Sequence, residues 1–253
     1  MGARVKLVFL TADDPLYLPP FFERVLDERA AETDEVVLVP PLYKGQGPVG
    51  AAWRYYRTFG ASAAVGLATR IAGAKLRRQS IAAVCARHGT RFSSVADVNS
   101  PAFVGRLARS RPDLVISVSC PQIFRTDLLG VPKEGCLNIH GALLPKYRGV
   151  MPSFWMLANG ERRAGASIYF MNEEIDAGEL CAQTSFPVLP DETLEAFLRR
   201  SKLVAADLLL DVLRRVEEGT LSRAPLDLTE GSYYSWPDRA AVARFRAAGR
   251  RLW

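Results

Sequence analysis

Short, uninterrupted apolar runs alternate with helical segments along the first half of the chain. Val5–Leu10, Glu35–Val39 and Leu114–Ser119 are such runs, and their lack of polar alternation predicts strands that are covered on both faces. Between the first two runs, Pro19 precedes a stretch, 21–31, with apolar residues at helical spacing. Strand, helix and strand at this spacing predict a parallel sheet with helices packed on it, an α/β fold.

The later segments extend this pattern. The Ala-rich stretch 50–88 predicts two helices joined near Gly73. We expect one domain over residues 1–220, followed by a C-terminal extension, 221–253, with an aromatic turn and a basic helix. Further elements are expected as an edge strand at 87–92, a helix at 101–109, a strand at 136–140, a helix at 151–159, antiparallel strands at 166–171 and 180–186, and a long amphipathic helix at 193–218.

Composition narrows the class of protein. With 49% hydrophobic and 24% charged residues, the chain has the make-up of a globular protein rather than a disordered one. Four scattered cysteines and two histidines cannot supply a zinc site of the usual spacing, so no metal is expected. Free thiols and the lack of a signal sequence or a long apolar segment predict a soluble, cytoplasmic protein.

Positive charge is concentrated in the middle of the chain. Residues 50–112 carry eleven Lys and Arg against the single acid Asp97. Three interpretations remain open: a solvated helix face, attraction for an anionic ligand, or peripheral contact of the basic aromatic region near 53–78 with an acidic membrane surface. Nucleic acid binding is disfavoured but not excluded, and a homodimer is left open.

The candidate catalytic residues are Asn138, His140 and Asp176. Asn138 and His140 are two apart near the carboxyl end of a predicted strand, so their side chains share a face where open α/β sheets place ligands. An amide N–H can donate to a developing oxyanion, and an imidazole can hold or move a proton near neutral pH. Asp176 lies before Gly178 in a predicted turn, from which it could orient the imidazole. This set suits acyl transfer to an amine.

Several motifs around these residues occur together. They are Asn138-x-His140, Leu143-Leu144-Pro145, Tyr147-Arg148-Gly149, Pro152 with Trp155, Gly160-Glu161 and Asp176-Ala177-Gly178. In this combination the sequence resembles the folate-dependent formyltransferases, a family that includes phosphoribosylglycinamide, methionyl-tRNA and nucleotide-sugar N-formyltransferases. The resemblance covers roughly residues 5–218 and is most specific over 112–180.

The resemblance implies a Rossmann-like domain with a mostly parallel, twisted sheet and N10-formyltetrahydrofolate as co-substrate. It implies that Asn138 binds the formyl oxygen, His140 stabilises or protonates the tetrahedral intermediate, and Asp176 holds His140 charged and helps to deprotonate the amine. Three loops are implied to bind the folate, with contacts from Cys120, Gln122, Ile123, Gly141, Leu143, Leu144, Pro145, Met171, Asn172 and Ile175. Contacts to substrate are expected from Lys146, Tyr147 and Arg148.

The acceptor is expected to be a primary amine on a small molecule, such as an amino sugar or a specialised metabolite. The chain is too short for the C-terminal barrel of methionyl-tRNA formyltransferases, and Gly141-Ala142 replaces a Pro-Ser pair of many family members. The alternatives are a formyltetrahydrofolate hydrolase, a methionyl-tRNA formyltransferase-like enzyme and a non-catalytic basic binding protein.

Overall fold

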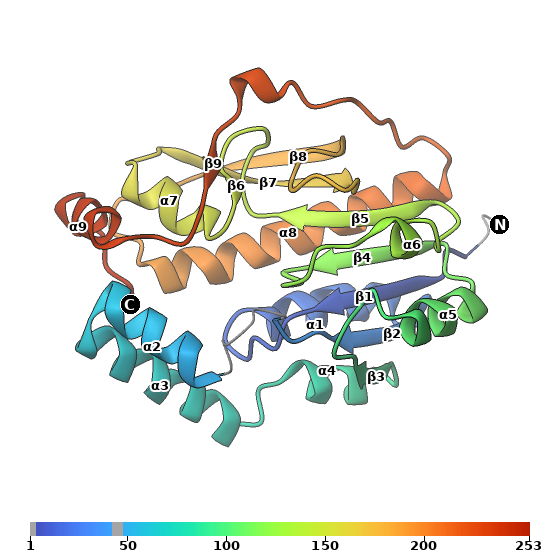
Figure 1. Ribbon diagram of the computed structural model, residues 1–253, viewed down its shortest axis with the longest axis horizontal. Coiled ribbons are helices and arrows are strands. Elements are labelled where there is room, and N and C mark those ends of the chain that lie inside the picture. The colour runs from blue at the N-terminus through green and yellow to red at the C-terminus, as the bar shows by residue number, and fades with distance from the viewer. Residues whose placement is uncertain (1–3, 42–47) are drawn as a thin grey trace.

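The centre of the molecule is a seven-stranded sheet (Figure 1). The computed structural model describes residues 4–41 and 48–253. The strand order is β3-β2-β1-β4-β5-β7-β8; the first five strands are parallel, and β7 and β8 are antiparallel to their neighbours. This confirms the predicted α/β sheet. The strands are β1 (Leu7–Thr11), β2 (Thr33–Leu38), β3 (Arg91–Ser94), β4 (Leu114–Val118), β5 (Gly135–His140), β7 (Arg163–Phe170) and β8 (Glu179–Pro187).

Helices cover both faces of the sheet, which explains why β1 and β4 are buried along their whole length. One face packs against α1 (Leu18–Arg29), α4 (Ile81–Arg87) and α8 (Leu194–Glu217). The other packs against α5 (Pro101–Ser110) and α6 (Thr126–Leu129). Side chains of successive strand residues point to opposite faces, so each apolar run supplies both cores.

The helical stretch after β2 differs from the prediction. It forms three helices, α2 (Pro48–Phe59), α3 (Ala61–Leu76) and α4, rather than two. The first break is at Gly60, whose φ of +94° favours glycine, and Ser80 caps α4 by accepting a hydrogen bond from the Ala83 N–H. Gly73 lies inside α3, so the predicted junction there is wrong. Glycine is tolerated within a helix, and a tertiary context can override its low propensity.

A third apolar cluster lies at one end of the sheet and joins distant segments of the chain. It is formed by α2, α3, α7 (Pro152–Ala158), the start of α8 and α9 (Arg239–Ala247). The C-terminal segment reaches it through η1 (Leu228–Glu230) and β9 (Tyr233–Tyr234), which pairs in parallel with β6 (Arg148–Gly149). Trp236 donates a hydrogen bond from Nε1 to the Thr58 hydroxyl. The segment after residue 220 therefore packs against the predicted catalytic domain.

None of the described helices combines the length and the apolar character needed to cross a membrane.

Candidate active site

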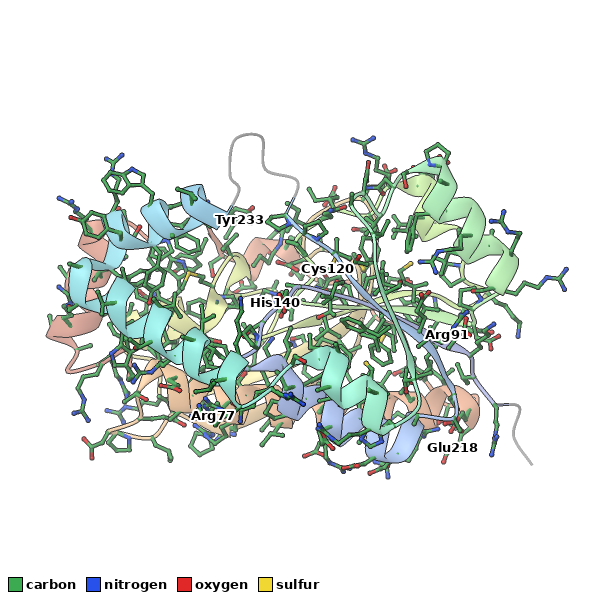
Figure 2. The ribbon with its side chains drawn as sticks, turned by 90° about the horizontal axis from the view of Figure 1, so that it is seen from below. Arg77, Arg91, Cys120, His140, Glu218 and Tyr233 are labelled. Carbon is green, nitrogen blue, oxygen red and sulfur yellow. The ribbon has the colours of Figure 1, made fainter. Side chains whose placement is uncertain are left out.

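Asn138 and His140 lie at the carboxyl-terminal end of β5, as the sequence predicts. Figure 2 shows His140 near the middle of the molecule. β5 is flanked by β4 on one side and by the antiparallel β7 on the other. In the β5–β7 register Asn138 stands opposite Tyr169 and His140 opposite Ser167. Asn138 is half-buried and His140 is buried. The sheet therefore holds both side chains in place from two sides.

Asp176 comes from the loop that connects β7 to β8, and the fold brings it to His140. Its Oδ1 is 3.5 Å from Nδ1 of His140, and both side chains are buried. Asp176 adopts a φ of +50°, a left-handed conformation that Asp tolerates better than most residues. Its Oδ2 accepts a hydrogen bond of 2.7 Å from the Gly149 N–H. The predicted proximity of these two residues is therefore present in the structure.

The imidazole of His140 is held between two acceptors. Its Nε2 is 2.8 Å from the carbonyl oxygen of Tyr147, which can only accept, so this nitrogen carries a hydrogen. On the other side Nδ1 faces the Asp176 carboxylate. Both ring nitrogens of His140 therefore face protein groups that accept hydrogen bonds.

Tyr169 links Asn138 to Asp176 and was not among the residues predicted for the site. Its hydroxyl donates 2.8 Å to Oδ1 of Asp176 and accepts 2.9 Å from Nδ2 of Asn138. Burial first, and then the negative charge of Asp176, raise the pKa of Tyr169 well above its usual range, so it stays a neutral donor. The one signal for Tyr169 was its place in a strand beside the catalytic segment.

Two further polar residues that were not predicted, Ser167 of β7 and Gln183 of β8, hold the loop after β5 by hydrogen bonds. The Ser167 hydroxyl donates to the Ala142 carbonyl at 2.6 Å and accepts from the Leu144 N–H at 3.0 Å. Gln183 donates from Nε2 to the Leu144 carbonyl and to Ser167. These bonds fix the segment for which folate contacts are predicted, namely Gly141, Leu143, Leu144 and Pro145.

The three predicted substrate contacts lie in different surroundings. Lys146 is exposed. Arg148 donates two hydrogen bonds from its guanidinium to the Ile175 carbonyl, which ties the two loops together. Tyr147 is buried, stacks on Tyr234 and donates to Glu161 at 2.6 Å. Its side chain therefore belongs to the aromatic core, and only its carbonyl, which accepts from His140, serves the site.

The loop after β4 carries three of the predicted folate contacts. Cys120 is half-buried, and Ile123 is exposed. Gln122 is buried, and its amide is fully engaged by backbone groups: it accepts from the Val98 N–H and donates to the carbonyls of Pro40 and Ala96. Its side chain therefore joins the loops that follow β2, β3 and β4, a structural task that the sequence did not indicate.

The loop after β7 carries the remaining predicted contacts. Met171 is half-buried, whereas Asn172 and Ile175 are exposed. Oδ1 of Asn172 accepts from the Glu174 N–H, which stabilises the turn that leads to Asp176. The loop thus presents apolar side chains next to the Asp176 carboxylate.

A polar cluster that was not predicted lies where the sheet reverses its strand order, between the ends of β1 and β4. Asp14 accepts hydrogen bonds from the N–H groups of Leu16 and Tyr17, and burial raises the pKa of its carboxyl. Lys202 of α8 donates to the Ser119 hydroxyl at 2.8 Å, and burial lowers the pKa of its ammonium. Both side chains are half-buried, at a position where α/β sheets bind ligands.

One group of residues in the described part of the chain has the geometry to hold a metal ion. Glu23, Asp27 and His88 offer ligand atoms within 4.8 Å of one another. They lie on α1 and at the end of α4, away from β5. Glu23 already forms an ion pair with Arg87, so the guanidinium of Arg87 neutralises part of the negative charge of this cluster.

Known proteins resemble this chain over the segment that holds the site. A family model described as Formyl transferase matches residues 63–213, which include Asn138, His140 and Asp176. The chain is 34% identical over 155 residues to a methionyl-tRNA formyltransferase of Geobacter metallireducens, a match that covers 61% of this chain and 50% of that protein. A second such enzyme, of Ruminiclostridium cellulolyticum, is 32% identical over 161 residues, covering 64% and 52%. The chain thus spans about half the length of these relatives.

Solved structures of formyltransferases share the fold. Glycinamide ribonucleotide transformylase 1 of Symbiobacterium toebii superposes with a TM-score of 0.62 at 19% identity, over 90% of this chain and 96% of that one. An N-formyltransferase of Helicobacter canadensis, solved with folinic acid and dTDP-3-aminofucose, gives 0.60 at 15% identity, over 91% and 71%. The family model covers more than half of the sequence, and the Rossmann-like fold agrees with it: the chain belongs to the formyl transferase family.

Proposed function

We propose that the protein transfers a formyl group from N10-formyltetrahydrofolate to a primary amine on a small molecule. The observation that carries the proposal is the set of Asn138, Tyr169, Asp176 and His140, which two strands and one loop bring together. Hydrogen bonds join Asn138 to Tyr169 and Tyr169 to Asp176, and the Asp176 carboxylate lies 3.5 Å from the His140 ring. Membership of the formyl transferase family supports the choice of reaction. The folinic acid in the Helicobacter canadensis structure supports a folate donor.

The residues around this set suit a folate. The loops after β4, β5 and β7 offer half-buried or exposed apolar side chains at Cys120, Ile123, Leu143, Met171 and Ile175. Backbone groups of the same loops lie between them. A flat, largely apolar ring system with a few polar edges is bound by surfaces of this composition.

The geometry assigns a task to each polar group. The amine nitrogen attacks the formyl carbon, and the carbonyl electron pair moves to the oxygen. Nδ2 of Asn138 carries two hydrogens, of which Tyr169 uses one, so the second donates to this oxyanion. His140 lies beside Asp176, its two ring nitrogens face protein acceptors, and its proposed role is to stabilise the oxyanion. Asp176 takes the proton from the attacking nitrogen and returns it to N10 as the bond between N10 and the formyl carbon breaks.

The proposed acceptor is an amine such as an amino sugar. The Helicobacter canadensis enzyme was solved with dTDP-3-aminofucose, and a sugar N-formyltransferase from a Shewanella species shares the fold with a TM-score of 0.58 at 21% identity. At the sheet reversal, Asp14 accepts hydrogen bonds from the N–H groups of Leu16 and Tyr17, just before α1, so these two N–H groups are not available to a phosphate of the acceptor.

The test is the release of tetrahydrofolate from N10-formyltetrahydrofolate, followed by absorbance with a panel of amino sugars. We expect His140→Ala to lower kcat by about 10²- to 10³-fold, the cost of losing one group that stabilises an oxyanion. His88→Ala is the matched control, because His88 is the other histidine and lies on the surface helix α4. Full turnover in His140→Ala would contradict the mechanism. Release of formate without an amine would instead identify a hydrolase.

Methionyl-tRNA is the second candidate acceptor, because the curated relatives named above are methionyl-tRNA formyltransferases. The assay distinguishes it directly: formylated methionyl-tRNA is detected by acid gel electrophoresis. Product with the tRNA and none with the sugar panel would replace the proposed acceptor class.

A further inference from the structure

Helices α2 and α3 lie side by side at one end of the molecule and use only one face to contact it (Figure 1). In α2 the inner face carries Phe59, which packs edge-on against Phe154. In α3 Ala63 and Ala74 are buried, and Gly66 contacts Trp253 so closely that a Cβ there would clash. These contacts anchor the pair and leave the opposite faces outward.

The outward faces are apolar, which is unusual for a surface. On α2 the exposed residues Val49, Trp53 and Tyr56 follow helical spacing, and the rings of Trp53 and Tyr56 stack. On α3 Val65 and Leu76 are 64% and 87% exposed. The α3 residues between these two on the same stripe are the exposed alanines at 68 and 72. Twelve large hydrophobic side chains are exposed in the described part of the chain, and five of them lie on these two helices.

The same region is strongly basic. The 61 residues from Val36 to Ala96 contain no Asp or Glu and nine Lys and Arg. Some of these cations pair with acids from elsewhere in the chain, as Arg70 does with Glu195. Four others form no ion pair with any described residue: Arg57, Lys75, Arg77 and Arg78. Arg77 lies at the end of α3, at the margin of the molecule (Figure 2).

We propose that the outward faces of α2 and α3 are a docking surface for a membrane with anionic lipids. Tryptophan and tyrosine favour the headgroup level of a bilayer, and valine and leucine gain by leaving water there. Each nearby Lys or Arg adds attraction to a negatively charged leaflet. Apolar stripes flanked by Arg57, Lys75, Arg77 and Arg78, on two helices that carry no acid of their own, fit such a membrane in both respects.

Two other occupants fit less well. The phosphates of a nucleic acid would pair with the cations. Val65 and Leu76 would contribute little to such binding, because an aliphatic side chain offers no ring on which a base can stack. A second copy of the chain, related by a two-fold axis, would set this basic surface against itself. The proposal does not depend on formyl transfer, since it concerns a surface that contributes no group to the catalytic set.

The experiment uses the whole protein with vesicles of phosphatidylcholine and phosphatidylglycerol, and with vesicles of phosphatidylcholine alone. Trp53 is a built-in reporter, because Trp155 is buried and Trp236 and Trp253 are half-buried. We expect cosedimentation and a shift of tryptophan emission to shorter wavelength with the anionic vesicles only. Trp53→Phe should keep most of the cosedimentation and lose the shift.

Paired variants separate the two contributions. Lys75→Ala/Arg77→Ala should weaken binding by on the order of tenfold, whereas Arg109→Ala/Lys133→Ala, which removes exposed cations elsewhere, should not. Trp53→Ser/Leu76→Ser should also weaken binding, and Leu203→Ser, at an exposed position on α8, should not. Far-UV circular dichroism verifies that each variant is folded.

Several results would overturn the proposal. One is a lack of cosedimentation with anionic vesicles, and another is equal binding by Trp53→Ser/Leu76→Ser and the unaltered protein. Tight binding to RNA that only the basic variant weakens would assign the surface to nucleic acid. A fall in molecular mass by light scattering in Trp53→Ser/Leu76→Ser, with vesicle binding unchanged, would assign it to self-association.

Discussion

Replacing Tyr169 by Phe tests whether one hydroxyl holds the catalytic set together. The Tyr169 hydroxyl lies between Asn138 and Asp176, donating to the carboxylate at 2.8 Å and accepting from the amide at 2.9 Å. A hydrogen bond to a charged group contributes about 1.5–3 kcal/mol and a neutral one about 1 kcal/mol. Because the phenylalanine ring fills the same space, no cavity term is added, and we expect a loss of about 3 kcal/mol of unfolding free energy.

For a chain of this size, 1 kcal/mol corresponds to about 2–4 °C in Tm, so Tyr169→Phe should lower Tm by about 6–12 °C. Without the Tyr169 hydroxyl, the Asn138 amide also loses its hydrogen-bond acceptor and can rotate away from the oxyanion. Deleting such a donor outright costs about 10²–10³ in kcat, and loosening it should cost on the order of tenfold. KM for the folate should stay unchanged, because the hydroxyl touches only the catalytic residues.

The assays are differential scanning fluorimetry and the tetrahydrofolate release assay. Tyr233→Phe is the matched control, since the Tyr233 side chain is 55% exposed and lies outside this hydrogen-bonded set. The reasoning is refuted if Tyr169→Phe keeps both the Tm and the kcat of the unaltered protein. A lower Tm with unchanged kcat would limit Tyr169 to a structural role.

Three further outcomes are expected. Gly178→Ala should unfold the protein or lower its free energy of unfolding by more than about 3 kcal/mol in chemical denaturation, because the new Cβ would lie 1.8 Å from the Phe170 carbonyl oxygen. Gly105→Ala, within α5, is the control and should raise the free energy of unfolding by up to about 1 kcal/mol. When the pH is raised from about 3 to about 7, Asp14→Asn should gain stability relative to the unaltered protein. The folded state holds the Asp14 proton more tightly than the unfolded chain does, so the unaltered protein loses this stabilisation as the pH rises past the pKa of Asp14 in the unfolded chain. Urea titrations at the two pH values would measure the difference. The thiols should resist iodoacetamide at neutral pH in the folded protein and react only on unfolding, as followed by mass spectrometry, because burial raises the pKa to about 11 or 12 at Cys85, Cys120, Cys136 and Cys181.

Local patterns were sufficient for most of the secondary structure. The buried strands β1, β2, β4 and β5 follow from uninterrupted apolar runs, since a strand covered on both faces needs no polar residues. The helices around residue 73 were misjudged because a glycine does not by itself end a helix. The actual ends were set by the left-handed backbone of Gly60 and by the Ser80 cap.

The proximity of Asn138, His140 and Asp176 could be predicted because each belongs to a short motif with chemistry of its own. The sequence indicated that an amide, an imidazole and a carboxylate would lie together in an α/β fold. Only the tertiary structure decided how they are connected. Tyr169 and Gln183 reach the site because β5 pairs with β7 and β7 pairs with β8. Contacts between paired strands are not marked by any fixed spacing in the sequence, so these two residues could not be predicted from it.

The same reason explains the residues whose surroundings differ from those expected. Tyr147 follows a catalytic loop in sequence, yet the C-terminal segment folds back and buries its ring against Tyr234. Gln122 follows β4, yet its side-chain amide donates hydrogen bonds to carbonyl groups of the loops after β2 and β3 rather than facing the predicted folate site. A sequence fixes which groups are available, whereas the partners that each group finds depend on segments far apart in the chain.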